Sequence, residues 1–300
     1  MLVDIILMPL FYGCDISGVD LGPEILINHN VEKIINNHFE IKSISQVDVE
    51  QVNSSEKYSD HQKLKYLNPI IKANQNLRDL VSQSLNQNHF PLVIGGDHAL
   101  ALGSLAAIAK NDPDTVVIWV DAHGDINTDE TTSTGNIHGM PLASAFNLSL
   151  DKLNHIFENN FLKPENLIYL GVRSLDPGEI EIIEKFNITH FTSQHIQELK
   201  IENILELVKI ILKQKDPKHV HLSFDIDVLD ASLVPGTGTP EIDGLNLDEV
   251  HQILKELAEL DIITSMDFVE FNPSLDQENQ TLKHSLVLLE TFFNNLNNSK

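Results

Sequence analysis

The sequence predicts a single α/β domain with a mostly parallel sheet. Short apolar runs of strand length alternate with longer amphipathic segments along all 300 residues. No repeat, linker or low-complexity segment divides the chain. Polar residues stand where several apolar runs end, and ligands of parallel α/β sheets bind beyond these carboxyl ends of the strands.

The first third of the chain follows this alternation. Residues 3–10 are nearly all apolar, as in a strand that is buried on both faces. Gly22 and Pro23 then lead into a helix that ends near residue 38, because proline favours the first turn of a helix. A second strand, a polar surface insertion and an amphipathic helix follow at residues 41–49, 50–60 and 64–88.

Several later strands end in groups that can bind ligands. A buried strand from residue 91 ends at Gly95, Gly96, Asp97 and His98 and runs directly into an apolar helix. Residues 115–121 form the next strand, and residues 219–227 repeat its design, since they are apolar until Asp225 and Asp227. The remaining elements in order are strand 166–172, helix 179–186, strand 188–192, helices to about 213, helix 247–260, strand 262–271 and helix 280–296.

The stretch from Asp121 to Asp125 predicts a metal site. Asp121, His123 and Asp125 alternate, so their side chains project to the same side if the backbone stays extended. Carboxylates and an imidazole suit a divalent ion such as Mn²⁺, and these charges would be costly to bury alone. A calcium-binding EF-hand loop is excluded, because Ile126 and Thr132 stand where that loop needs Gly and Glu.

Composition and net charge indicate which classes of binding partner are unfavourable. The formal net charge of -24 disfavours nucleic acid and anionic membrane surfaces. It would help to attract a cationic substrate, although acidity that only keeps the protein soluble needs no partner. No apolar run reaches the length of a membrane span, and the start of the chain lacks the features of a signal peptide. The single cysteine, Cys14, is interpreted as a small buried hydrophobe and is compatible with a reducing cytoplasm.

Five segments resemble motifs of the arginase (ureohydrolase) family. They are GGDHALALGS at 95–104, DAHGDIN at 121–127, TGNIHG at 134–139, SFDIDVLDASLVPGTGTP at 223–240 and EFNPSLD at 270–276. The resemblance implies one catalytic domain over residues 1–300, a three-layer αβα arrangement around a mostly parallel sheet of about eight strands.

The resemblance also implies two Mn²⁺ ions per chain, bridged by Asp121 and Asp225. The full set of implied ligands is His98, Asp121, His123, Asp125, Asp225 and Asp227. A hydroxide shared by the two ions would attack the guanidinium carbon of L-arginine, giving L-ornithine and urea. Asp125 would pass a proton to the leaving nitrogen, His138 would shuttle protons, and Glu270 would pair with the guanidinium. Co²⁺ and Fe²⁺ would satisfy the same donors.

Five residues match substrate contacts of the family: Asn127, Thr134, Asp176, Glu179 and Thr239. Asn127 and Thr134 stand where the family holds the α-carboxylate with Asn and Ser. Asp176 and Glu179 match the acidic pair that receives the α-ammonium. With Pro177 between them, they are equally typical of a helix N-terminus, and both interpretations can hold, since a capping carboxylate keeps a free lone pair.

Alternatives to an arginine-hydrolysing enzyme stay open from the sequence. Agmatine or guanidinobutyrate would suit the same chemistry. A catalytically silent regulatory paralogue would lack activity, although all six ligand positions are intact. A homo-oligomer is expected on family grounds, yet Asp248 stands where trimer-forming relatives often have an Arg.

Overall fold

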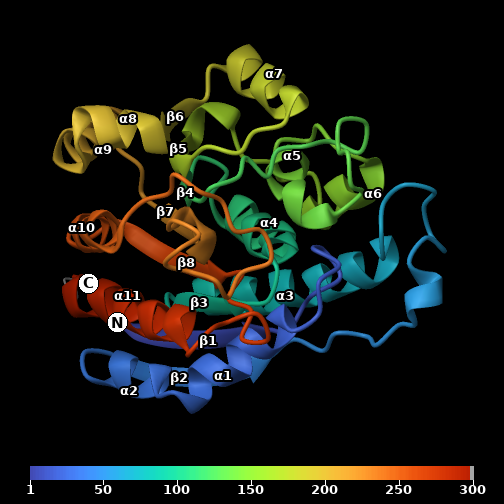
Figure 1. The fold of residues 1–300 in the computed structure, drawn as a ribbon, viewed down its shortest axis with the longest axis horizontal. Coiled ribbons are helices and arrows are strands. Elements are labelled where there is room, and N and C mark those ends of the chain that lie inside the picture. Colours follow the sequence, from blue (N-terminus) through green and yellow to red (C-terminus); the bar gives the residue numbers. More distant parts are fainter. Residues whose placement is uncertain (298–300) are drawn as a thin grey trace.

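The structure, a computed structural model, describes residues 1–297, and within them it contains one eight-stranded sheet (Figure 1). The strands lie in the order β2-β1-β3-β8-β7-β4-β5-β6, and every neighbouring pair is parallel. All eight predicted strands are confirmed. Their bounds are Leu2–Met8 (β1), Glu40–Gln46 (β2), Phe90–Gly95 (β3), Val116–Val120 (β4), Leu167–Val172 (β5), Thr189–Thr192 (β6), Val220–Asp225 (β7) and Ile263–Val269 (β8).

Helices cover both faces of this sheet, so the predicted three-layer arrangement is confirmed (Figure 1). Alternate residues of β4 point to opposite faces: Ile118 packs in one core and Trp119 in the other. The first core also contains α1 (Gly22–Asn28), α2 (Val31–Asn36), α8 (Ser193–Leu199), α9 (Ile201–Lys215), α10 (Leu247–Ala258) and α11 (Gln280–Asn295). The second contains α3 (Leu67–Asn86), α4 (Ala101–Asn111), α5 (Pro141–Ala145), α6 (Asp151–Asn154) and α7 (Pro177–Phe186).

Two helical regions differ from the sequence predictions. The single helix expected up to residue 38 is interrupted between α1 and α2, because Asn30 adopts a left-handed backbone with φ of 72°. Asparagine tolerates this conformation better than most residues. The helices α5 and α6 were not predicted, since five and four residues are too few to show a helical period.

Strand order places the predicted site. The four strands β3, β8, β7 and β4 are adjacent at the centre of the sheet, although they are far apart in the sequence. His98 follows β3, Glu270 follows β8, Asp225 ends β7 and Asp121 follows β4. Because all four strands are parallel, these residues lie at the same edge of the sheet.

Other expectations concern the surface and the cysteine. Cys14 is buried, as predicted. The polar segment 50–60 is largely exposed and contains only a short 3₁₀ turn, Ser54–Glu56. Among the helices described within residues 1–297, none is both long and apolar enough to span a membrane.

Candidate metal centre and active site

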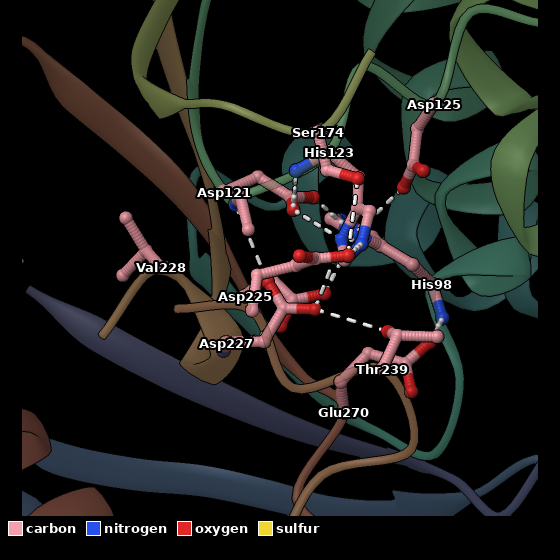
Figure 2. Close-up of polar contacts among 12 residues, drawn as sticks. His98, Asp121, His123, Asp125, Ser174, Asp225, Asp227, Val228, Thr239 and Glu270 are labelled. Atoms are coloured by element: carbon pink, nitrogen blue, oxygen red, sulfur yellow. Dashed lines mark hydrogen bonds and ion pairs between the residues drawn. The ribbon is translucent and has the colours of Figure 1, made fainter. Parts of the chain in front are cut away.

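The backbone after β4 turns sharply within the predicted ligand stretch. His123 still forms a parallel bridge with Ser174, but Asp125 adopts a left-handed backbone with φ of 48°. The expectation of an extended backbone through Asp125 is therefore wrong. The side chains of Asp121, His123 and Asp125 nevertheless converge, because the turn brings Asp125 back towards the strand ends (Figure 2).

One group of candidate ligands surrounds His98. Its Nδ1 lies 3.0 Å from Oδ2 of Asp121, 3.1 Å from Oδ2 of Asp125 and 3.2 Å from Oδ2 of Asp225 (Figure 2). This nitrogen is buried and has no hydrogen-bond partner among the described residues. Nε2 is engaged at 2.8 Å by the Ser223 hydroxyl, so Nδ1 is the nitrogen left to face the carboxylates.

A second group shares Asp121 with the first. Nδ1 of His123 lies 3.0 Å from Oδ2 of Asp227 and 3.5 Å from Oδ1 of Asp121. Two sets of ligand atoms each lie within 4.8 Å of one another: His98 with Asp121 and Asp225, and Asp121 with His123 and Asp227. Asp121 belongs to both sets, which is the position of a bridging carboxylate.

The electrostatics of this cluster favour bound cations. Four buried carboxylates face only two imidazoles. Burial raises the pKa of Asp225 well above its ordinary value, and the charges of Asp227 and Asp121 raise it further. Burial lowers the pKa of His98, but its contacts with the carboxylates outweigh burial and raise the pKa overall. Oxygen and imidazole donors short of positive charge fit divalent ions such as Mn²⁺.

Glu270 and His138 lie beside these ligands. Oε1 of Glu270 accepts the backbone N–H of His98 at 2.8 Å and lies 3.2 Å from Nδ1 of His138. Oε2 is buried and has no partner among the described residues. Burial lowers the pKa of His138, but Glu270 and nearby carboxylates raise it overall. A buried, unpaired carboxylate oxygen next to a metal-type cluster suits a cationic group of a substrate.

The substrate candidates Asn127, Asp176 and Glu179 are also brought together. The Asn127 amide donates to Oδ2 of Asp176 at 2.9 Å. Both oxygens of Glu179 accept backbone N–H groups, from Ile126 at 3.1 Å and from Asp176 at 2.9 Å. Burial raises the pKa of Glu179 to about 7. The helix-terminus interpretation is supported, because Asp176 stands directly before α7.

Comparison with known proteins decides the family. The arginase family model matches residues 3–293. The chain belongs to the arginase family. It is 39% identical to arginase from Staphylococcus aureus strain COL, over 97% of this chain and 96% of the relative. It is also 39% identical to arginase from Bacillus caldovelox, over 97% of both chains. The family consists of metal-dependent hydrolases.

Solved arginases have the same fold as this arginase-family chain. The native structure of Bacillus caldovelox arginase superposes with a TM-score of 0.90 at 38% identity, covering 97% of both chains. Arginase from Entamoeba histolytica in complex with L-ornithine gives 0.89 at 31% identity, again over 97% of both. The formimidoylglutamase of Bacillus subtilis, at 22% identity and a TM-score of 0.76, shares the fold alone.

Sequence reasoning missed residues that support the candidate ligands of this arginase-family chain. Trp119 donates from Nε1 to Oδ2 of Asp121 at 2.9 Å and stacks on His98, with ring centroids 4.1 Å apart. Ser223 holds the other nitrogen of His98. Trp119 and Ser223 each stand two residues before a predicted ligand, so strand alternation could have placed them on the ligand side.

The remaining predicted contacts, Thr134 and Thr239, lie in different surroundings. Thr239 donates from Oγ1 to Oδ2 of Asp227 at 3.1 Å, so its hydroxyl contacts a metal-ligand candidate (Figure 2). Thr134 is exposed, and its hydroxyl accepts the backbone N–H of Asn136 at 3.1 Å. No hydrogen bond within residues 1–297 joins Thr134 to Asn127. The substrate roles of both threonines stay predictions.

Proposed function

We propose that this chain hydrolyses the guanidinium group of L-arginine to L-ornithine and urea. Membership of the arginase family supports this reaction type. The observation that carries the proposal is the unpaired Oε2 of Glu270 beside the carboxylate cluster, because a guanidinium would supply the missing donors. Agmatine and guanidinobutyrate are less favoured, since three of the four residues predicted for an amino acid's polar end, Asn127, Asp176 and Glu179, lie together.

We further propose two Mn²⁺ ions per chain. His98, Asp121 and Asp225 would hold one ion, with Asp125 beside them, and Asp121, His123 and Asp227 the other. Asp225 is the proposed second bridge. Bound divalent ions supply Lewis acidity and lower the pKa of a bound water towards neutrality. The orphaned Nδ1 of His98 and the excess of buried carboxylates support this donor assignment.

Three side chains would act on the substrate at the guanidinium end. Glu270 would pair with the guanidinium through Oε2 and orient its carbon, while Oε1 stays bonded to the backbone of His98. When the bond between the guanidinium carbon and Nε of arginine breaks, Asp125 would deliver to that nitrogen the proton that it takes up from the attacking water. His138 would carry protons between Glu270's surroundings and solvent, since its side chain is partly exposed.

At the other end of the substrate, Asp176 would receive the α-ammonium and Asn127 the α-carboxylate. Their mutual hydrogen bond keeps both groups at one place before a substrate arrives. Glu179 has both oxygens engaged by backbone N–H groups, so we assign it the positioning of Asp176 and of the segment before Asn127. Thr134 and Thr239 are proposed as further contacts.

The remaining proposals concern the whole protein. We propose one catalytic domain over residues 1–300, operating in the cytoplasm, which the buried lone thiol of Cys14 and the matched range 3–293 support. A homo-oligomer is proposed from the family alone. Asp248 is exposed in the first turn of α10, so any intersubunit contact there would differ from one made by an Arg.

The experiment compares urea release from L-arginine, agmatine and 4-guanidinobutyrate after the protein is warmed with Mn²⁺. Agmatine lacks the α-carboxylate and guanidinobutyrate lacks the α-ammonium. Preference for arginine is expected. Preference for either analogue would overturn the assignment of Asn127 and Asp176 while leaving the hydrolysis in place. No urea from any substrate, with metal bound, would make the chain a silent paralogue.

A further inference from the structure

The carboxylate of Glu241 lies against the outer nitrogen of His123. Nδ1 of His123 faces Asp227 at 3.0 Å and is the nitrogen on the metal side. Nε2, on the opposite side of the ring, lies 3.7 Å from Oε1 of Glu241. Glu241 belongs neither to the two groups of candidate ligands nor to the residues that the sequence motifs single out.

The surrounding structure holds Glu241 in this place. The Ser174 hydroxyl donates to the same oxygen, Oε1, at 3.1 Å. Ser174 is itself tied to His123 by a backbone bridge, and Figure 2 shows their side chains beside each other. Ser174 therefore holds the Glu241 carboxylate facing His123, because the backbone of Ser174 is paired with that of His123.

Arg173 fixes the backbone of the loop that carries Glu241. Its guanidinium donates to carbonyl oxygens on both sides of the loop: those of Asp227, Val228 and Leu229 after β7, and those of Glu241 and Ile242. These distances are 2.9 to 3.1 Å. One partly buried cation thus fixes the Glu241 backbone to the segment that supplies the candidate ligand Asp227.

We propose that Glu241 is a positioning residue for the metal centre. Its negative charge, 3.7 Å from Nε2 of His123, favours the tautomer with the proton on Nε2, which leaves Nδ1 unprotonated and facing Asp121 and Asp227. A carboxylate behind a metal-ligating imidazole fixes the tautomer and ring orientation and makes the ligand nitrogen more basic. The inference rests on the proposed metal site and deepens it.

An ordinary surface ion pair between Glu241 and His123 would not change metal affinity in this way. The Glu241 side chain is 38% exposed and that of His123 is 22% exposed, so solvent screens a simple pairing and leaves it little effect on stability. A cation on Nδ1 would withdraw electron density from the ring and strengthen the attraction between the Nε2–H group and the Glu241 carboxylate. The contribution of Glu241 therefore shows in metal affinity and not in the stability of the metal-free protein.

The test measures Mn²⁺ affinity by chelator competition, without substrate, for the whole chain and three variants. Glu241→Ala is expected to weaken Mn²⁺ binding about 10- to 100-fold. Glu241→Gln keeps an acceptor oxygen without the charge, so its Mn²⁺ affinity should lie between those of wild type and Glu241→Ala. Asp243→Asn is the matched control, since it removes one charge from the same loop. Within residues 1–297 the Asp243 side chain has no hydrogen bond or ion pair.

Two further measurements separate the possible failures. The metal-free thermal midpoint should be equal for wild type and Glu241→Ala; a drop in that midpoint with unchanged affinity would make Glu241 structural only. Affinity that matches the Asp243→Asn control would likewise overturn the inference. Urea release at saturating Mn²⁺ is followed in parallel: wild type that binds Mn²⁺ without releasing urea overturns the proposed function and leaves the role of Glu241 standing.

Discussion

Two buried histidines of the same sheet region face carboxylates, and only one of them belongs to the proposed cation site. His98 belongs to the edge cluster, which we define as His98, Asp121, Asp125 and Asp225. His221 belongs to the strand network, which we define as His221, Ser265, Asp267 and Ser104. Both sets combine imidazole and carboxylate, and both are almost completely buried.

The difference lies in which nitrogen atoms have partners. In the strand network, Nδ1 of His221 lies 2.9 Å from the Ser265 hydroxyl and Nε2 lies 3.2 Å from Asp267. One carboxylate therefore serves one imidazole. Oδ2 of Asp267 also accepts the Ser104 hydroxyl, and only Oδ1 is left without a partner among the described residues. In the edge cluster, three carboxylates converge on one nitrogen of His98, Nδ1. A pairing of one carboxylate with one imidazole builds structure, whereas a surplus of buried negative charge calls for a cation.

The largest effect is expected from breaking the edge cluster. Asp225→Ala removes a ligand shared by the proposed ions, so metal content should fall and kcat/KM should drop roughly 10³-fold or more, the equivalent of about 4 kcal/mol. Asp121→Ala should do the same. Metal analysis and urea release check this, with Asp248→Ala as an exposed control. Normal turnover with full metal content would refute the ligand assignment.

Breaking the strand network should lower stability and leave the metal content unchanged, the opposite of what is expected for the edge cluster. Asp267→Ala leaves His221 without its carboxylate, and loss of one partner of a buried pair costs about 3 kcal/mol of unfolding free energy. Denaturant unfolding of the metal-free protein measures this loss, and the metal content of the folded variant should match wild type. If metal were lost while stability stayed the same, the strand network would belong to the metal site.

Glu270→Gln separates substrate binding from metal binding within the active site. The amide oxygen can still accept the backbone N–H of His98, so folding and metal content should be retained. Loss of the charge-assisted contact with the guanidinium should lower kcat/KM about 100-fold. Steady-state kinetics beside metal analysis check both parts. Unchanged kinetics would mean that another group holds the guanidinium.

The smallest effect concerns the amino-acid end of the substrate. Asp176→Asn should raise KM for L-arginine about tenfold, because it weakens one charge-assisted contact. KM for 4-guanidinobutyrate should not change, since that compound has no α-ammonium. Glu179→Gln is the companion variant: it disturbs a positioning residue and should impair both substrates. Equal effects of Asp176→Asn on both substrates would contradict direct ammonium binding.

Local patterns predicted most of the fold. The eight strands and the longer helices followed from apolar runs and helical periods that are visible within single segments. The break at Asn30 was not predicted, because one left-handed residue leaves the apolar period on both sides intact. The short helices α5 and α6 escaped because tertiary packing, and not a local period, stabilises such short elements.

The sequence predicted the candidate ligands well, but not the residues that hydrogen-bond to them or stack on them. His98, Asp121 and Asp225 stand at strand ends within recognisable motifs, and the structure brings them together. Trp119 and Ser223 had only the weak signal of strand alternation. Their roles depend on which strand lies next to which, because their partners come from different strands.

By itself, the sequence determined the strand segments, their burial and the donor atoms at their carboxyl ends, because these depend on side chains close together in the chain. Only the tertiary structure decided that β3, β8, β7 and β4 are neighbours, that His221 meets one carboxylate while Nδ1 of His98 faces three, and that Glu241 reaches His123. Such pairings join distant segments, and the free energy that selects them comes from packing the whole sheet between its helices.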